Sequence, residues 1–255
     1  MWKGARVSNY PMRDAAATTI ASTRRRVVVV GGTSGIGAAV AGRFAAAGAE
    51  VIAAGLVPLD GVAPTDDAVD VAAVDLRRPS EIEDLIAGLS SLSVLVNAAG
   101  VIRRDDEFDP DVFRDVVEIN LVGAMRASVA AHRLLAASAG CIVNVASMLS
   151  YFGGPRVPAY AASKGGVVQL TKSLAVAWAE DGIRVNAVAP GWIRTDLTAG
   201  LRQHQATATQ IVSRTPMGRW GEAADVAGAV EFLAGPDAAF ITGAVLPVDG
   251  GYLAA

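Results

Sequence analysis

The length, composition and charge of the chain exclude several classes of protein. Its 255 residues suffice for one large α/β domain or two small ones. Hydrophobic residues make up 52% of the chain and charged residues 18%, which excludes a largely disordered protein. The 22 Lys and Arg residues against 25 Asp and Glu leave a net charge of −3, whereas nucleic-acid-binding proteins usually carry a basic excess. We therefore expect a folded protein that binds no nucleic acid.

Cysteine and histidine are scarce. The one cysteine, Cys141, has no partner for an intrachain disulfide, and we expect it to be a small buried hydrophobic residue. The two histidines, His132 and His204, are too few for a typical metal site. This usage predicts a protein of the reducing cytoplasm that holds no metal.

No segment predicts membrane insertion or export. Residues 134–155 carry no charge, but Asn144 and several Ser and Gly residues interrupt them, so we expect no membrane span there. The N-terminal residues lack the continuous apolar core of a secretory signal. The run Arg24–Arg26 leads into an apolar stretch that turns at once into glycines, and we interpret it as the start of a strand.

The pattern becomes regular at Arg26, after a mixed segment that we expect to be a flexible extension over residues 1–23. Short apolar and β-branched runs then indicate seven strands at Val27–Val30, Val51–Ala54, Val71–Val74, Ser93–Val96, Cys141–Ala146, Arg184–Val188 and Ala244–Val248. Helical patterns occur at Ala38–Ala47, Pro79–Leu89, Pro110–Ala137, Ala159–Glu180 and Glu222–Ala234.

Strands that alternate with helices predict a doubly wound α/β fold, with a seven-stranded parallel sheet covered on both faces. No linker or internal repeat divides it, so we expect a single Rossmann-fold domain over residues 24–255. The crossover Leu56–Asp70 departs from the pattern: it holds three Pro or Gly and four Asp residues, and we expect a loop with little helix.

A glycine-rich turn follows the first strand. Gly31, Gly35 and Gly37 lie where the strand turns into a helix, a context in which glycine lets a pyrophosphate approach the helix N-terminus. The first spacing is one residue wider than in the ordinary dinucleotide fingerprint.

Tyr160 and Lys164 are four residues apart at the start of a helix, so both side chains lie on one face. An ammonium near a phenol favours the phenolate and is expected to lower the pKa of Tyr160 toward working pH, where the phenol exchanges protons with a hydroxyl or carbonyl. Ser147 and the segment 97–100 each follow a strand, and ligands bind at the carboxyl edge of an open parallel sheet.

Taken together, these motifs resemble the short-chain dehydrogenases/reductases over about residues 26–255. The resemblance rests on the order of the Gly31/Gly35/Gly37 turn, Asp75, Asn97–Gly100, Asn120, Ser147, Tyr160 with Lys164, Pro190-Gly191 and Asp249-Gly250-Gly251. It implies that Tyr160 is the general acid/base and that Ser147 hydrogen-bonds the reacting oxygen. Lys164 would hold the nicotinamide ribose, and Asn120 a water of the proton relay. The alternative for Asn120 is a polar residue that caps or bends a helix.

The same resemblance implies a nicotinamide dinucleotide cofactor. Its contacts would come from Gly31, Thr33, Ser34, Gly35, Ile36, Gly37, Asp75, Leu76, Asn97, Ala98, Ala99, Gly100, Tyr160, Lys164, Pro190, Gly191, Ile193 and Thr195. The chain departs from the family pattern at Val30, where Thr is usual, and at Ala98, where Asn is usual. Both departures affect cofactor affinity or local stability more than chemistry.

The preference between NAD and NADP depends on the residue at the end of the second strand. An acidic residue there favours NAD, and a basic residue favours NADP. Gly55 and Leu56 offer neither. Arg77 and Arg78 follow Asp75 and could reach a 2′-phosphate, but we expect them to be solvated. We therefore favour NAD, with NADP as the alternative.

The substrate is suggested by basic residues near the tetrad of Asn120, Ser147, Tyr160 and Lys164. The segments 100–104, 147–150 and 154–158 resemble sugar-acid members of the family, the gluconate 5-dehydrogenases and 2-deoxygluconate 3-dehydrogenases. Arginine holds a carboxylate bidentately, so Arg104 or Arg156 could bind the acid while Ser147 and Tyr160 meet the hydroxyl. Either arginine could instead lie on the surface or at a subunit interface.

Three other functions are compatible with the same fold. A 3-oxoacyl-carrier-protein reductase or a polyol dehydrogenase would share this fold, and a non-catalytic nucleotide sensor would be expected to lack part of the tetrad.

The family carries a substrate lid where Trp192–Arg214 lies in this chain. The helix Ala159–Glu180 is apolar on more than one face, which together with the resemblance suggests a homotetramer. We expect a small-molecule substrate and no membrane partner.

Overall fold

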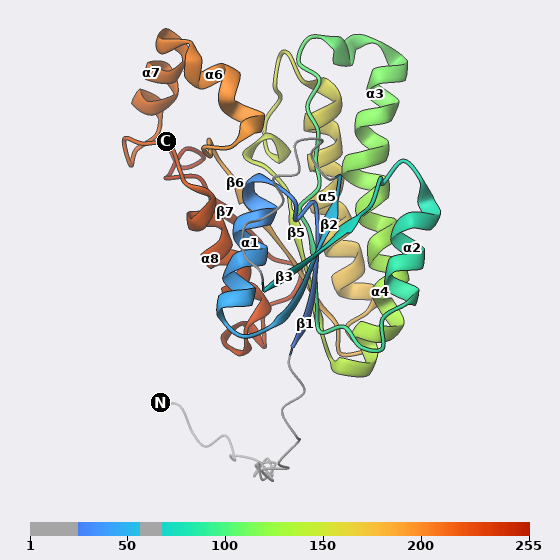
Figure 1. Cartoon of the computed structure of the whole chain (residues 1–255). Helices are drawn as coiled ribbons and strands as arrows, with labels where there is room; N and C mark the ends of the chain where they lie inside the picture. The colour runs from blue at the N-terminus through green and yellow to red at the C-terminus, as the bar shows by residue number, and fades with distance from the viewer. Residues whose placement is uncertain (1–24, 57–67) are drawn as a thin grey trace, which may run out of the picture.

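The computed structural model describes residues 25–56 and 68–255 (Figure 1). The strands are β1 (Arg26–Val30), β2 (Glu50–Gly55), β3 (Val69–Ala73), β4 (Val94–Asn97), β5 (Cys141–Val145), β6 (Arg184–Pro190) and β7 (Val245–Val248). The α-helices are α1 (Gly35–Ala46), α2 (Pro79–Ala87), α3 (Pro110–Val117), α4 (Gly123–Ser138), α5 (Pro158–Ala177), α6 (Ala199–Gln203), α7 (Gln205–Arg214) and α8 (Ala223–Ala234). Short helical turns are η1 (Asp106–Phe108), the π-helical η2 (Glu118–Val122), η3 (Met148–Ser150), η4 (Asp196–Thr198) and η5 (Pro236–Ala238).

All seven strands pair in parallel, in the order β3-β2-β1-β4-β5-β6-β7. The chain moves outward from β1 to β3 and then returns to place β4 on the other side of β1. At this reversal the connections leave on opposite faces of the sheet, which opens a crevice at the carboxyl ends of the strands. Val30 lies opposite both Ala54 and Asn97, so the glycine turn begins at this crevice.

The hydrophobic core consists of two layers, one on each face of the sheet. Val27 and Val29 point toward α1 and α8, whereas Val28 and Val30 point toward α2 and α4. Figure 1 shows α1 and α8 on one side of the sheet and α2, α4 and α5 on the other. The continuous β-branched run of β1 is therefore explained by burial on both faces.

The predicted fold class and the seven strands are confirmed, with strand ends within two residues of the expected positions. The predicted helix over Pro110–Ala137 is wrong in one respect, because the π-helical turn η2 interrupts it between α3 and α4. The extension over residues 1–23 and most of the crossover Leu56–Asp70 lie outside the described residues.

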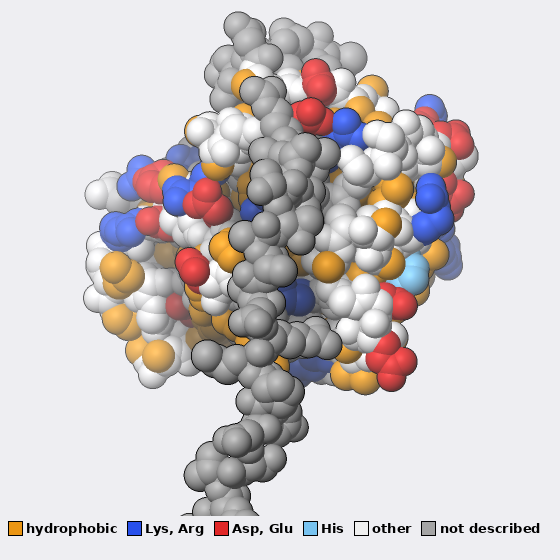
Figure 2. Space-filling view, turned by 90° about the horizontal axis from the view of Figure 1, so that it is seen from below, with side chains coloured by type: hydrophobic (Ala, Val, Ile, Leu, Met, Phe, Trp, Pro, Cys, Tyr) orange, Lys and Arg blue, Asp and Glu red, His pale blue; other side chains and the backbone are white. Residues whose placement is uncertain are grey.

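The segment after β6 forms η4, α6 and α7, which lie above the carboxyl edge of the sheet (Figure 1). The opposite face, at the amino ends of the strands, carries acidic and basic side chains side by side (Figure 2). In the described ranges, no helix is both long and apolar enough to cross a bilayer.

Candidate active site

The glycine turn adopts a backbone that larger residues would not tolerate. Gly31 has a φ of +82°, and a Cβ there would lie 2.4 Å from the backbone nitrogen of Ala99. A Cβ on Gly37 would lie 2.0 Å from the carbonyl oxygen of Gly31. Ser34, the N-cap of α1, makes no side-chain cap hydrogen bond. The turn therefore leaves backbone N–H groups at the start of α1 accessible to an anion.

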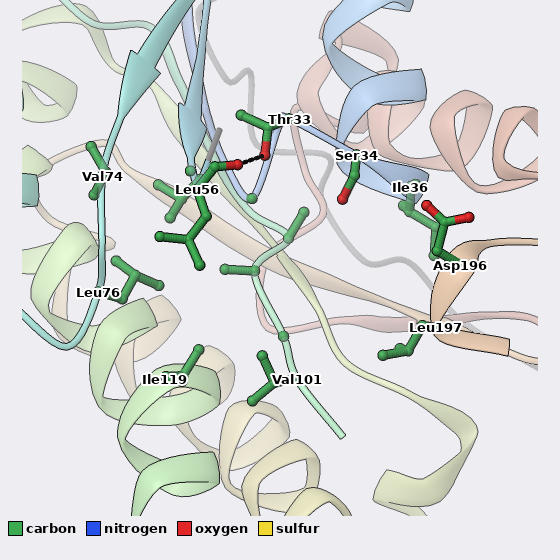
Figure 3. Close-up of a pocket in the computed structure, with 18 of the residues that line it drawn as sticks. Thr33, Ser34, Ile36, Leu56, Val74, Leu76, Val101, Ile119, Asp196 and Leu197 are labelled. Atoms are coloured by element: carbon green, nitrogen blue, oxygen red, sulfur yellow. Dashed lines mark hydrogen bonds between the residues drawn. The ribbon is translucent and has the colours of Figure 1, made fainter. Parts of the chain in front are cut away.

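A cavity of about 430 Å³ opens above this turn, and Figure 3 shows Thr33 and Ser34 on one side of it and Leu76 and Ile119 on the other. Most residues predicted to contact the dinucleotide line it: Gly31, Thr33, Ser34, Gly35, Ile36, Gly37, Asp75, Leu76, Ala98, Ala99, Gly100 and Thr195. Thr33 Oγ1 donates a hydrogen bond to the carbonyl oxygen of Leu56 at 2.9 Å, which ties the turn to the end of β2. The shape and the cradle fit the adenosine and pyrophosphate of a dinucleotide.

Asn97 points into the protein interior, unlike the rest of the segment 97–100. Its side chain is buried and donates to Asn144 Oδ1 at 2.9 Å and to Ser128 Oγ at 3.2 Å. Asn144 in turn donates to Thr171 Oγ1 at 2.9 Å. Asn97 thus braces β4 against β5 and α4, while Ala98, Ala99 and Gly100 face the cavity.

A second cavity, of about 400 Å³, adjoins the first and contains the predicted reacting groups. Ser147 follows β5, and Tyr160 and Lys164 lie in the first two turns of α5; all three line this cavity, with Pro190, Gly191, Ile193 and Thr195. Lys164 Nζ donates to the carbonyl oxygen of Val145 at 2.7 Å and lies 5.7 Å from the centre of the Tyr160 ring. Both groups are buried beside the ligand space, as a proton-transfer site requires.

Asn120 lies in the π-helical turn η2 and fastens the neighbouring segments together. Its Oδ1 accepts from the backbone nitrogen of Val101 at 2.8 Å, and its Nδ2 donates to Val101 O at 3.0 Å and Ser163 Oγ at 3.1 Å. A Cβ on Gly100 would lie 3.4 Å from Lys164 Nζ and 3.7 Å from Asn120 Oδ1. Gly100 therefore lies beside both Lys164 and Asn120. Single π-helical turns of this kind are frequent at functional sites.

Burial dominates the electrostatics of the Tyr160–Lys164 pair. Burial raises the pKa of Tyr160, and the charge of Glu107 raises it further, while a hydrogen bond with Ser147 and the charge of Arg104 lower it. Burial lowers the pKa of the Lys164 ammonium to about 8. The expectation that Lys164 brings the pKa of Tyr160 below its usual value is therefore wrong for this chain, since desolvation outweighs the nearby charges.

The two arginines predicted to bind an acid differ in their partners. The Arg156 guanidinium forms a bidentate pair with the Asp105 carboxylate, and both side chains are exposed. Arg104 is half-buried, and in the described part of the chain it forms no salt bridge; its Nη1 makes one long contact, 3.4 Å, with the carbonyl oxygen of Leu197. Both arginines line the second cavity, but Arg104 has the free guanidinium.

Several residues that line the second cavity were not assigned to the site from the sequence, among them Arg214 and Tyr252. Arg214, at the end of α7, lies with its guanidinium carbon 4.4 Å from the centre of the Tyr252 ring, and both residues line the second cavity. These positions are remote from the tetrad in sequence. Arg214 lies in the segment after β6 and Tyr252 in the turn after β7, and only the fold brings both to the cavity.

Comparison with known proteins agrees with this geometry. A family model described as enoyl-(acyl carrier protein) reductase matches residues 30–253. The 2-dehydro-3-deoxy-D-gluconate 5-dehydrogenase of Escherichia coli K12 is 37% identical over 247 residues, covering 90% of this chain and 96% of the relative. This chain belongs to the short-chain dehydrogenase/reductase family.

Two further members of the family are similar over most of their length. The galactitol 2-dehydrogenase (L-tagatose-forming) of Cereibacter sphaeroides is 39% identical, covering 88% of this chain and 93% of the relative. A crystal structure of a gluconate 5-dehydrogenase from Burkholderia cenocepacia J2315, in complex with NADP and tartrate, superposes with a TM-score of 0.83 at 33% identity, covering 91% of this chain and 96% of that one. The chain is an NAD(P)-dependent oxidoreductase that interconverts a secondary alcohol and a ketone.

Proposed function

We propose that the substrate is a small polyhydroxy acid, a sugar acid, and that Tyr160, Ser147, Lys164 and Asn120 carry the reaction. The observation that supports this most is the unpaired guanidinium of Arg104 in the same cavity as Ser147 and Tyr160. A half-buried cation without an ion-pair partner favours an anionic ligand. Gluconate-type substrates in the names of similar proteins agree with such a ligand.

The substrate hydroxyl would lie between Tyr160 Oη and Ser147 Oγ. In the direction of reduction, the Tyr160 hydroxyl donates a proton to the carbonyl oxygen, while the Ser147 hydroxyl donates a hydrogen bond to the same oxygen as charge develops on it. The Lys164 ammonium, whose Nζ donates to Val145 O and lies beside the Tyr160 ring, would stabilise the charge left on Tyr160 Oη. Lys164 and a water held by Asn120 would then return a proton to Tyr160. The bound reduced nicotinamide would supply the hydride to the carbonyl carbon.

The residues that would hold the dinucleotide are those of the glycine turn and of the segments after β3, β4 and β6. The turn's N–H groups would bind the pyrophosphate, Asp75 and Leu76 the adenine edge, Ala98–Gly100 the adenosine, and Pro190–Thr195 the carboxamide. Lys164 would also bind the nicotinamide ribose.

We favour NAD over NADP for this cofactor. Gly55 offers no charge to the ribose, and the Arg77 guanidinium is bound by the Asp75 carboxylate at 2.7 Å, which holds the pKa of Asp75 below its usual value. Arg77 nonetheless lines the first cavity, so it is the residue through which NADP would be accepted.

Replacing Arg77 by Ala should therefore change the ratio of kcat/KM for NAD to that for NADP by less than about threefold, the scale of an exposed charge contact. Arg78→Ala is the matched control, because Arg78 is also exposed and forms its ion pair with Glu81. Steady-state rates with both cofactors measure the ratio. A selective loss of NADP activity of about tenfold or more in Arg77→Ala would assign Arg77 to a 2′-phosphate and reverse the preference.

Replacing Arg104 by Ala should raise KM for an acidic sugar by about tenfold to a hundredfold, the value of one charge-assisted contact. Because Arg104 also lowers the pKa of Tyr160, the tyrosine-dependent limb of the pH profile should move to higher pH. Arg114→Ala is the control, since Arg114 pairs with Asp111 on the exposed face of α3. An unchanged KM would remove Arg104 from the substrate site.

Initial rates over a substrate panel test the proposed function itself. The panel contains gluconate, 2-keto-3-deoxygluconate, simple polyols and a 3-oxoacyl thioester, each with NAD and with NADP. We expect turnover of a sugar acid with lower KM than that of the matching uncharged polyol. If only uncharged polyols react, the acid is not recognised and a polyol dehydrogenase is supported.

The second candidate is a 3-oxoacyl-carrier-protein reductase, which the exposed Arg103 favours as a docking residue beside Arg104. Turnover of the thioester alone in the panel would support it. A non-catalytic nucleotide sensor is disfavoured because all four tetrad residues are present.

We also propose a cytoplasmic homotetramer whose catalytic domain spans residues 24–255, after an extension over residues 1–23. The helices α4 and α5 leave large apolar side chains exposed, among them Val129 at 53% and Val176 at 81%. Such side chains on adjacent helices favour burial against a second copy of the chain.

A further inference from the structure

Glu107 is a buried acidic residue beside the candidate active site that the proposed mechanism does not use. It lies in η1, and 1% of its surface is exposed. In residues 25–56 and 68–255 it is the one acidic residue in the buried class. Because an isolated carboxylate is costly to bury, its hydrogen-bond partners indicate what it does.

The two carboxylate oxygens of Glu107 bind two different parts of the chain. One accepts a hydrogen bond from the backbone nitrogen of Tyr160 at 2.9 Å. The other accepts from the backbone nitrogen of Arg103 at 2.8 Å, and Glu107 N donates back to Arg103 O at 3.1 Å. Glu107 therefore joins the loop after β4 directly to the reacting tyrosine.

The position of Tyr160 on its helix explains why a carboxylate is stable there. Helix α5 begins at Pro158, so Tyr160 N is one of the first backbone donors, which have no partner inside the helix. The partial positive charge at the helix N-terminus also favours an anion. Around it, Val116, Val157 and Ala159 form an apolar cluster with Tyr160, which excludes water from the contact.

A second contact fastens the same loop on the other side of Arg104. Asp105 has a φ of +69°, its backbone nitrogen donates to Arg156 O at 2.9 Å, and its carboxylate pairs with the Arg156 guanidinium. Arg104 thus lies between Arg103, whose backbone nitrogen donates to Glu107, and Asp105, which contacts Arg156. Its guanidinium reaches the cavity from a backbone held at both sides.

We propose that Glu107 is a positioning residue, which locks the backbone of Tyr160 and the loop that carries Arg104 into one unit. This rests on the proposed function, because Arg104 then holds the acid end of the substrate at a fixed distance from the hydroxyl that meets Tyr160. Preorganisation of this kind acts on the reaction as well as on binding, since a displaced substrate reacts slowly.

The charges around Tyr160 supply a readout specific to Glu107. Two groups reach Tyr160 from the loop after β4: Arg104, whose charge lowers the pKa of Tyr160, and Glu107, whose charge raises it. The third charged group near the ring is Lys164 on α5 itself. Removing the charge of Glu107 should therefore move the tyrosine-dependent limb of the pH profile to lower pH, opposite to the effect of Arg104→Ala.

Two variants separate charge from contact. Glu107→Gln keeps the length of the side chain and removes the charge, while placing an amide N–H against a backbone donor. We expect kcat/KM for the sugar acid to fall about tenfold, the value of one buried hydrogen bond to a charged group, and the pH limb to move to lower pH. Glu107→Asp keeps the charge but does not reach Tyr160 N, so kcat/KM should fall by a similar factor with the limb unmoved.

Asp106→Asn is the matched control, because Asp106 lies in the same helical turn with an exposed side chain, and we expect wild-type rates and pH profile. Cofactor binding, followed by the fluorescence of the reduced cofactor, should be unchanged in all three variants, which shows that each is folded. The proposal is overturned if Glu107→Gln keeps the wild-type kcat/KM and pH limb, or if its activity falls with cofactor affinity and thermal stability while the limb stays in place. Failure of the proposed function is separate, since the wild-type enzyme would then not turn over an acidic sugar.

Discussion

Replacement of Tyr160 by Phe is expected to lower kcat/KM by about a hundredfold to ten thousandfold, the usual contribution of a positioned general acid/base. The phenylalanine ring fills the same buried space, so the fold and both cavities should persist. Only the hydroxyl that exchanges the substrate proton is lost. Steady-state rates in both reaction directions measure the loss, and cofactor fluorescence shows whether the dinucleotide still binds.

Tyr151→Phe is the matched control for this variant. Tyr151 lies nine residues earlier in the chain, its side chain is half exposed, and it lines neither of the two described cavities. It should keep wild-type rates. Near-normal turnover by Tyr160→Phe would mean that another group moves the proton, and the mechanism proposed for this site would be wrong.

Replacement of Gly37 by Ala should abolish cofactor binding at ordinary concentrations and destabilise the fold. The added Cβ would lie 2.0 Å from Gly31 O and 2.7 Å from Gly31 C, so the turn that cradles the pyrophosphate must shift. We expect a loss of about 1–3 kcal/mol in the free energy of unfolding, typical of overpacking. The cofactor Kd should rise about tenfold or more, as when a charged group loses a backbone hydrogen bond.

Gly42→Ala tests the same substitution on the same helix without the clash. Gly42 lies in α1, and beyond the backbone of its own helix no atom lies within 4 Å of the added Cβ. This variant should bind cofactor normally and gain up to about 1 kcal/mol of stability, because Ala is the better helix former. Denaturant unfolding and cofactor titration compare the two. Equal cofactor affinity in both variants would show that the turn does not bind the pyrophosphate.

Most of the fold could be predicted because the sheet is buried on both faces. Runs such as Val27–Val30 have to be apolar throughout, and that makes them visible in the sequence. The interruption of the long helix at η2 was not predictable in the same way, since Asn120 makes its hydrogen bonds to Val101 and Ser163, which are distant in sequence. The apolar sequence pattern predicts a continuous helix over these residues. It does not show where the helix widens, because the hydrogen bonds of Asn120 at that turn go to residues distant in sequence.

The candidate site was predictable where its residues follow strand ends and less so where burial and pairing decide their chemistry. The sequence placed Tyr160 and Lys164 on one helix face, but the direction of the Tyr160 pKa depends on desolvation by the whole fold. The sequence likewise offered no reason to prefer Arg104 or Arg156 as the residue that binds the acid. The structure separates them, because it pairs Arg156 with Asp105. Glu107 lies in an acidic run with nothing local to distinguish it from its exposed neighbours.

The central claim, that this enzyme moves a hydride at a secondary carbon of an acidic sugar, is tested most directly by deuterium transfer. The keto forms of the sugar acids are incubated with reduced cofactor that is fully deuterated at C4 of the nicotinamide ring, and the products are examined by mass spectrometry and NMR. We predict a single deuterium on the carbon that carries the new hydroxyl, and very little labelled product with Tyr160→Phe. The claim would be contradicted if no acidic sugar acquires the label while a 3-oxoacyl thioester or an uncharged ketose does.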